Sequence, residues 1–216
     1  MNPPAAVLFD FDGVLADSRL AITRSLNHGL AAVGADERPA AELEHWIGPP
    51  LLHAFRALAG PERAEAGVAA YRERYRSASL SETVAVPGMV AAVARVAGAG
   101  VPFAVATSKP RALVLPLLDA LGYAGLFGVV EGPSLEPALA EDKSVTVARA
   151  LAALGLSPGA DAVLVGDRSH DAAAARANAI ACVGVLWGIG DEEELRAAGA
   201  TRLVRTPAEL PAALRL

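Results

Sequence analysis

Residues 5–13 are Ala5-Ala6-Val7-Leu8-Phe9-Asp10-Phe11-Asp12-Gly13. Prolines precede this apolar run and a glycine follows it, so residues 5–9 are predicted to form a short buried strand. On an extended chain Asp10 and Asp12 point to the same side. Two like charges that close stay ionised only if a cation or a proton compensates them. The stretch therefore predicts a metal or a shared proton at the carboxyl end of a strand, where open α/β sheets bind ligands.

Downstream of this strand, from residue 87 onward, predicted strands and helices alternate. This order is typical of a parallel sheet covered by helices on both faces. The helix that follows Pro87 has this proline in its first turn and ends near residue 98. Further strands are predicted at 101–106, 126–130, 162–165, 180–185 and 203–204, and helices at 111–121, 145–154, 172–179, 192–198 and 208–214.

Between the first strand and this alternating part, the pattern is helical. A helix starts near Ser18 and ends near Gly34, and residues 38–80 are helical with breaks at Gly-Pro turns. We therefore expect residues 1–17 and 83–216 to form an α/β core, and residues 18–82 to form a separate helical insertion.

Composition narrows the class of protein. The chain has 216 residues, of which 53% are hydrophobic, and a net charge of −5. The sequence has no stripe of basic residues, which argues against nucleic acid as a partner. The single cysteine, Cys182, lies in an apolar stretch and is predicted to be an inert core thiol. No signal peptide or apolar run of membrane-spanning length stands out, so we expect a cytoplasmic protein that does not bind membranes.

Four polar clusters occupy predicted strand ends or helix starts, and a parallel sheet brings such positions to one edge. Carboxylates, hydroxyls and a lysine at such an edge suit phosphoryl transfer, and Mg²⁺ favours carboxylate oxygens. The clusters are Asp10 with Asp12, Thr107 with Ser108, Lys143, and Asp167 with Asp171.

In this order and placement the clusters resemble the four motifs of the haloacid dehalogenase superfamily, in its phosphatase branch. The resemblance covers the whole chain and implies a Rossmann-like parallel sheet with an inserted all-helical cap. Among members, phosphoglycolate-phosphatase-like enzymes are the most similar, through Thr107-Ser108-Lys109-Pro110 and the cap turn Ile47-Gly48-Pro49-Pro50-Leu51. The resemblance implies a phosphatase that hydrolyses a small phosphate monoester, and phosphoglycolate is the best single candidate for this substrate.

The resemblance also implies a role for each matching residue. Asp10 would attack phosphorus and become an aspartyl phosphate, and Asp12 would protonate the leaving oxygen and then activate water. Thr107 and the backbone of Ser108 would hold the phosphoryl oxygens, while Lys143 would neutralise nucleophile and phosphate.

For the metal, the resemblance implies Mg²⁺ held by Asp10, the backbone carbonyl of Asp12, and Asp167. Asp171 would act through water or orient the other ligands. In the cap, which would close over the site, His53 and Arg56 are the candidates to touch substrate. The cap residues Arg72, Arg74 and Arg76 are expected to form a solvated helix face.

Several alternatives remain open from the residues alone. Lys143 lacks the proline that often follows the third-motif lysine, which leaves Lys109 as a rival. Asp171 could be only the cap of a helix, and Arg168 could face the site or solvent. His170 is expected at the surface or behind the ligands.

Rival functions also remain. A phosphomutase of the same superfamily, similar to β-phosphoglucomutase, would use the same motifs, and a receiver-like or inactive phosphate-binding protein is a further alternative. A dehalogenase is disfavoured because Asp12 would have no leaving oxygen to protonate. The expected partner is a small phosphorylated metabolite, and the chain is expected to be a monomer or a homodimer.

Overall fold

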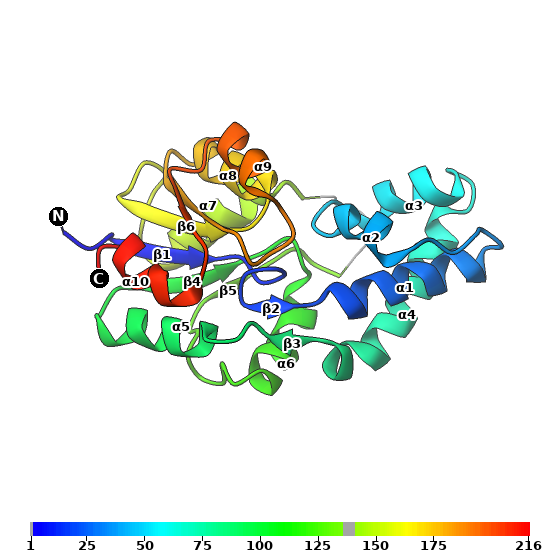
Figure 1. Cartoon of the computed structure of the whole chain (residues 1–216), viewed down its shortest axis with the longest axis horizontal. Coiled ribbons are helices and arrows are strands. Elements are labelled where there is room, and N and C mark those ends of the chain that lie inside the picture. Colours follow the sequence, from blue (N-terminus) through cyan, green and yellow to red (C-terminus); the bar gives the residue numbers. More distant parts are fainter. Residues whose placement is uncertain (1, 136–140) are drawn as a thin grey trace. The chain divides into compact units, whose positions relative to one another are not determined.

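The computed structural model describes residues 2–135 and 141–216 (Figure 1). Contacts within the chain divide it into two units. The larger unit comprises the chain up to Ala16 and from Ala85 onward, and the smaller unit comprises Asp17–Val84. No helix in the described ranges is long and apolar enough to cross a membrane.

The larger unit contains a parallel sheet in the order β5-β4-β1-β6-β7-β8. Its central strand β1 pairs with β4 on one side and β6 on the other, so that Leu8 lies opposite both Ala104 and Leu164. The strand order therefore reverses at β1, and this confirms the predicted α/β class. The strands are β1 (Ala6–Phe9), β4 (Phe103–Ala106), β5 (Val130–Glu131), β6 (Ala162–Gly166), β7 (Ala181–Val185) and β8 (Arg202–Val204).

Helices cover both faces of this sheet, because successive residues of a strand point to opposite sides. Val7 and Phe9 of β1 pack into the core with α5 (Met89–Gly98), α6 (Arg111–Ala120) and α10 (Leu210–Ala213). Ala6 and Leu8 pack toward α7 (Lys143–Ala153) and α8 (Ser169–Ala177). In Figure 1, α7 and α8 lie on the upper side of the sheet and α5 and α10 on the lower side. The remaining helices of this unit are α9 (Glu192–Ala198), which packs on α8, and the 3-10 helix η2 (Pro207–Glu209).

Two details differ from the sequence-based prediction. The strand expected at 126–130 is wrong except for its last residue, because Leu126 donates to Tyr123 in a turn and Phe127 packs its ring against Phe9 and Phe103. The apolar character of this segment therefore reflects an aromatic cluster. Pro87 does not enter a helix: α5 begins at Met89, and Gly88 before it has a φ of +87°, which is outside the range of a right-handed helix.

The smaller unit is mainly helical, as the pattern over 38–80 predicts. Helices α1 and α3 pack on α4. The close approach depends on Gly29 and Gly67, because a Cβ on either would lie within 2.6 Å of the Phe55 ring. The elements are α1 (Arg19–Ala32), α2 (Ala40–Leu43), the 3-10 helix η1 (Glu44–Trp46), α3 (Leu51–Ala59) and α4 (Ala64–Glu82). A short sheet of β2 (Ala16–Asp17) and β3 (Val84–Ala85), which the sequence does not predict, is formed where the chain passes between the units.

Candidate active site

The sequence-predicted residues of the larger unit lie at the carboxyl ends of three neighbouring strands. Asp10 and Asp12 follow β1, Thr107 follows β4, and Asp167 follows β6. These loops meet where the strand order reverses, which is the position where open α/β sheets form their ligand crevice. Ser108, next to Thr107, is partly buried in the same loop.

Lys143, the first residue of α7, joins two of the carboxylates. Its Nζ lies 2.7 Å from Asp10 Oδ2 and also forms an ion pair with Asp171 Oδ1. None of these three side chains is more than 7% exposed. Burial opposes the charge of Lys143, but the attraction of Asp10 and Asp171 outweighs it and raises the pKa of Lys143. The amine therefore stays protonated beside Asp10 at neutral pH.

Asp171 uses its second oxygen to hold the loop that precedes it. Its Oδ2 accepts hydrogen bonds from the backbone N–H groups of Asp167, at 3.0 Å, and Arg168, at 2.9 Å. Burial acts to raise the pKa of Asp171, but the nearby Lys143 lowers it overall. Asp171 therefore caps the start of α8 and also contacts Lys143. Its role toward a metal stays a prediction.

A loop after β7 fixes the carboxylate of Asp167. Asp167 Oδ2 accepts from the Ile189 N–H at 2.7 Å, and the Asp167 carbonyl accepts from Gly190 at 3.1 Å. A Cβ on Gly188 or on Gly13 would overlap the Asp167 side chain, so a larger residue at either position would displace that carboxylate. Sequence analysis did not single out this loop. The signal was available, since Gly188 and Gly190 follow a strand of the same sheet.

Lys109 contacts the other first-strand carboxylate. Its Nζ lies 2.6 Å from Asp12 Oδ1 and 2.7 Å from Oδ2. The backbone N–H of Lys109 donates to Thr107 Oγ1 at 3.2 Å, which leaves the Thr107 hydroxyl hydrogen available to an incoming acceptor. The structure therefore places both lysines that the sequence left as rivals, Lys143 at Asp10 and Lys109 at Asp12.

Burial and neighbouring negative charges raise the pKa values of two carboxyl groups in the site, Asp10 and Asp167. Burial raises the pKa of Asp10 to about 6, to which the charges of Asp171 and Asp12 contribute while Lys143 opposes them. Burial and the same Asp171 charge raise the pKa of Asp167 well above its ordinary value. Among the described residues, neither Asp10 Oδ1 nor Asp167 Oδ1 has a hydrogen-bond partner, although both are buried.

These features fit a divalent cation. Asp10, Asp12, Asp167 and Asp171 carry two more charges than the ammonium groups of Lys109 and Lys143 offset. An oxygen-rich, anionic set with two orphaned carboxylate oxygens matches the ligand preference of Mg²⁺. Within residues 2–135 and 141–216, Lys109 and Lys143 are the only buried cationic side chains, so the donor set suits the predicted metal.

His170 is closer to this centre than the sequence suggests. One ring nitrogen of His170 and carboxylate oxygens of Asp10 and Asp171 lie within 4.8 Å of one another. Burial lowers the pKa of His170 to about 4, so the imidazole is neutral at pH 7. Its neighbour Arg168 donates from Nε to Glu194 at 3.0 Å. His170 therefore belongs to the shell around the carboxylates.

Comparison with known proteins identifies the family. The model of the haloacid dehalogenase-like hydrolases matches residues 7–185, which include Asp10, Asp12, Thr107, Lys143, Asp167 and Asp171. The chain belongs to the haloacid dehalogenase-like hydrolases. Among solved structures of this hydrolase fold, a predicted phosphatase from Clostridium acetobutylicum superimposes over 100% of both chains with a TM-score of 0.91 and 30% identity.

Curated relatives of this haloacid dehalogenase-like hydrolase include phosphatases. A 5′-nucleotidase of Pseudomonas aeruginosa is 38% identical over 88% of this chain and 86% of its own length. Phosphoglycolate phosphatase 1 of the same organism is 31% identical over 86% of this chain and 70% of its own length. Tyrosine-protein kinase PtkA of Mycobacterium tuberculosis is 36% identical over 87% of this chain and 64% of its own length. The chain is a phosphoric monoester hydrolase of this family.

The helical unit of the hydrolase contains the remaining sequence candidates. His53 and Arg56 are exposed on α3, and the His53 ring lies 5.7 Å from that of Trp46. The expectation of a solvated arginine face is wrong for Arg74, because its guanidinium lies 2.8 Å from Glu82 and also donates to Ser25. Arg74 therefore ties helices of this unit together.

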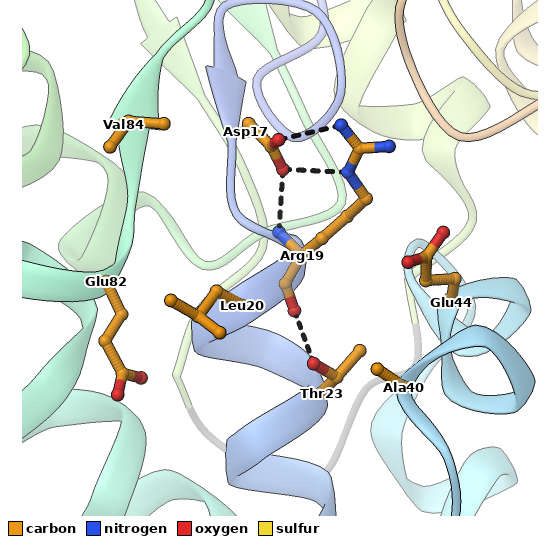
Figure 2. A pocket seen from close by; sticks show the side chains of 8 residues that line it. All are labelled: Asp17, Arg19, Leu20, Thr23, Ala40, Glu44, Glu82 and Val84. Carbon is orange, nitrogen blue, oxygen red and sulfur yellow. Dashed lines mark hydrogen bonds and ion pairs between the residues drawn. The ribbon is translucent and has the colours of Figure 1, made fainter.

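A cavity of about 390 Å³ opens within the same helical unit (Figure 2). Arg19 lies on its wall with two guanidinium nitrogens turned to Asp17, at 2.7 Å and 2.9 Å. Glu44, on η1, lies on the other side of the cavity from Glu82 and Val84. The walls are therefore partly charged and partly apolar. The lining residues are Asp17, Arg19, Leu20, Thr23, Ala40, Glu44, Glu82 and Val84.

Proposed function

We propose that this hydrolase cleaves a small phosphate monoester through an aspartyl-phosphate intermediate on Asp10, and that it requires Mg²⁺. One observation carries the proposal. Asp10 is buried with Oδ2 paired to Lys143, while Oδ1 has no hydrogen-bond partner among the described residues. A carboxylate with one neutralised and one free oxygen is suited to nucleophilic attack.

The first half-reaction follows from these contacts. Asp12 takes up a proton from solvent as the substrate binds; Asp10 Oδ1 then attacks phosphorus, the ester oxygen leaves, and Asp12 gives that oxygen the proton. The Thr107 hydroxyl and the backbone of Ser108 donate to the phosphoryl oxygens, and the Lys143 ammonium offsets charge at Asp10. The product is an acyl phosphate on Asp10 and a free alcohol.

The second half-reaction restores the enzyme. Asp12, now ionised, takes a proton from water, and the resulting hydroxide attacks the phosphorus of the acyl phosphate. Inorganic phosphate leaves and Asp10 is regenerated as a carboxylate. Asp10, the Asp12 carbonyl and Asp167 would hold Mg²⁺, with Asp171 behind them, and the ion would supply positive charge to the phosphoryl oxygens.

The names of the curated relatives suggest the class of substrate that we propose. Two of them are named 5′-nucleotidase and phosphoglycolate phosphatase, so nucleoside 5′-monophosphates and phosphoglycolate are the candidate substrates. The expected partner is therefore a small phosphorylated metabolite, with His53 and Arg56 as candidate contacts on the helical unit.

Phosphate release from a panel of monoesters tests this function. The panel includes phosphoglycolate, nucleoside 5′-monophosphates and sugar phosphates, each with Mg²⁺ or with excess chelator. We expect release by the wild type with Mg²⁺ only, and loss by a factor on the order of a thousand or more in Asp10→Asn.

The matched control is Asp36→Asn, which makes the same change at an exposed position of the helical unit and should behave as the wild type. Full activity of Asp10→Asn would refute the mechanism. Interconversion of sugar phosphates without net release would favour the phosphomutase.

A further inference from the structure

The chain contains two lysines, Lys109 and Lys143, among its 19 basic residues. Both are buried in the candidate active site, with side chains 6% and 4% exposed. Each contacts a different carboxylate of the first-strand pair, since Lys143 binds Asp10 and Lys109 binds Asp12. In the proposed mechanism Lys143 offsets negative charge at Asp10, whereas Lys109 has no role.

The ammonium of Lys109 contacts both oxygens of Asp12. The distances from Nζ are 2.6 Å to Oδ1 and 2.7 Å to Oδ2, and the Asp12 side chain is 16% exposed. The ammonium is a point charge, and close contact with both oxygens fixes where the carboxylate lies. The Asp12 carboxylate is thereby held in place, two residues along the chain from the proposed nucleophile.

Lys109 is itself held in place. Its backbone N–H donates to Thr107 Oγ1 at 3.2 Å, and its Nζ lies 5.5 Å from the centre of the Phe11 ring. On the other side, a Cβ on Gly132 would overlap the Lys109 carbonyl, so the β5 loop packs tightly against this backbone. The position of the ammonium is therefore set by the loop that also carries the candidate phosphate-binding hydroxyl.

We propose that Lys109 is the positioning residue of Asp12. It holds the Asp12 carboxylate beside the place where the leaving oxygen arrives, and it links that placement to Thr107. This inference rests on the proposed function, in which Asp12 transfers the proton. The competing role is direct contact between Lys109 and the phosphoryl group, which would act without Asp12.

A double-mutant cycle separates these roles. The variants are Lys109→Met, Lys109→Arg, Asp12→Asn and the double variant Lys109→Met with Asp12→Asn. The substrates are p-nitrophenyl phosphate, whose leaving group needs little protonation, and a simple alkyl phosphate, whose leaving group needs it. The readout is kcat/KM, which includes the first phosphoryl transfer, with kcat and KM also compared separately.

We expect Lys109→Met to lower kcat/KM for the alkyl ester by roughly 10–100-fold and for p-nitrophenyl phosphate by much less. KM should change little, and Lys109→Arg should restore most of the loss. In the Asp12→Asn background, Lys109→Met should cost less than about twofold, because the residue it positions is gone. An equal loss in both backgrounds, or a raised KM with unchanged kcat, would overturn the proposal.

A second readout does not depend on activity. Protein labelled with ¹³C at the lysine ε-carbon gives signals from two lysines only, and Lys109→Arg identifies which belongs to Lys109. Asp12→Asn should shift the Lys109 signal and leave that of Lys143 nearly unchanged, and Asp10→Asn should do the reverse. A Lys109 ε-carbon chemical shift that is the same in the wild type and in Asp12→Asn would contradict the pairing of Lys109 with Asp12.

Failure of the proposed function gives a different pattern. If the wild type releases no phosphate, or if Asp10→Asn remains fully active, the proposed function fails and the positioning role fails with it. If wild type and Asp10→Asn behave as proposed while the Lys109 variants do not, only the positioning role fails.

Discussion

At the scale of single residues, the site depends on how each carboxylate oxygen is used. Asp171 has both oxygens engaged, with Lys143 and with two backbone N–H groups. Asp10 and Asp167 each keep one buried oxygen without a hydrogen-bond partner in the described part of the chain. Because unpaired buried carboxylate oxygens are costly, this division predicts where a cation is needed. The backbone N–H of Ile189 binds Asp167 Oδ2, so Oδ1 is the oxygen without a hydrogen-bond partner among the described residues.

Gly188→Ala tests that last point. The new Cβ would overlap the Asp167 side chain, so Asp167 must turn and its hydrogen bond from Ile189 weakens. We expect the affinity for Mg²⁺, measured by calorimetric titration of the purified protein, to fall roughly 10–100-fold. The control is Gly98→Ala, at a helical position where a Cβ meets nothing within 4 Å. Unchanged Mg²⁺ affinity in Gly188→Ala would show that the loop does not position Asp167.

At the scale of elements, the sequence predicts the strands of the sheet better than the contacts between helices. The buried strands around Leu8 and Leu164 are apolar runs bounded by breakers, and such runs are visible in one dimension. The contact of Gly29 and Gly67 with Phe55 joins three helices and has no local signal. The ion pairs of Arg24 and Arg74 with Glu82, which join α1 and α4, also have no local signal in the sequence.

Glu82 at the end of α4 is the centre of these ion pairs and makes stability depend on pH. It pairs with Arg74 at 2.8 Å and with Arg24 of α1 at 2.9 Å. The hydrogen bond from Arg74 is the main cause of the lowered pKa of Glu82. A depressed carboxyl pKa contributes stability above the unfolded-state value of about 4.5, and this contribution is lost as the pH falls through the folded-state value.

Glu82→Gln should therefore lower the free energy of unfolding by about 1 kcal/mol at pH 7. The difference from the wild type should shrink as the pH is lowered below about 4.5, because the wild type then loses the same charge. Denaturant unfolding at a series of pH values measures this. The control Glu73→Gln, at an exposed position of the same helix, should change stability little at any pH. A constant difference at all pH values would contradict the linkage.

At the scale of the whole molecule, the class of fold and the position of the site could be predicted because both depend on chain order. A parallel sheet collects its strand ends at one edge, so Asp10, Thr107 and Asp167 could be grouped without coordinates. The partners of Lys143 and Lys109 could not be predicted. Both lysines lie near strand ends or helix starts, and only the three-dimensional placement assigns one to each carboxylate. The roles of these residues in turnover remain predictions.

The most direct test of the account is to look for the phosphoryl group on Asp10. The Asp12→Asn variant should form the acyl phosphate from p-nitrophenyl phosphate and hydrolyse it slowly, because the base that activates water is missing. Acid-quenched protein, digested and analysed by mass spectrometry, should carry one phosphoryl group on the peptide containing Asp10, and hydroxylamine should remove it. A variant that turns over the ester with no phosphoryl group on that peptide, or with the group on another residue, would contradict the central claim.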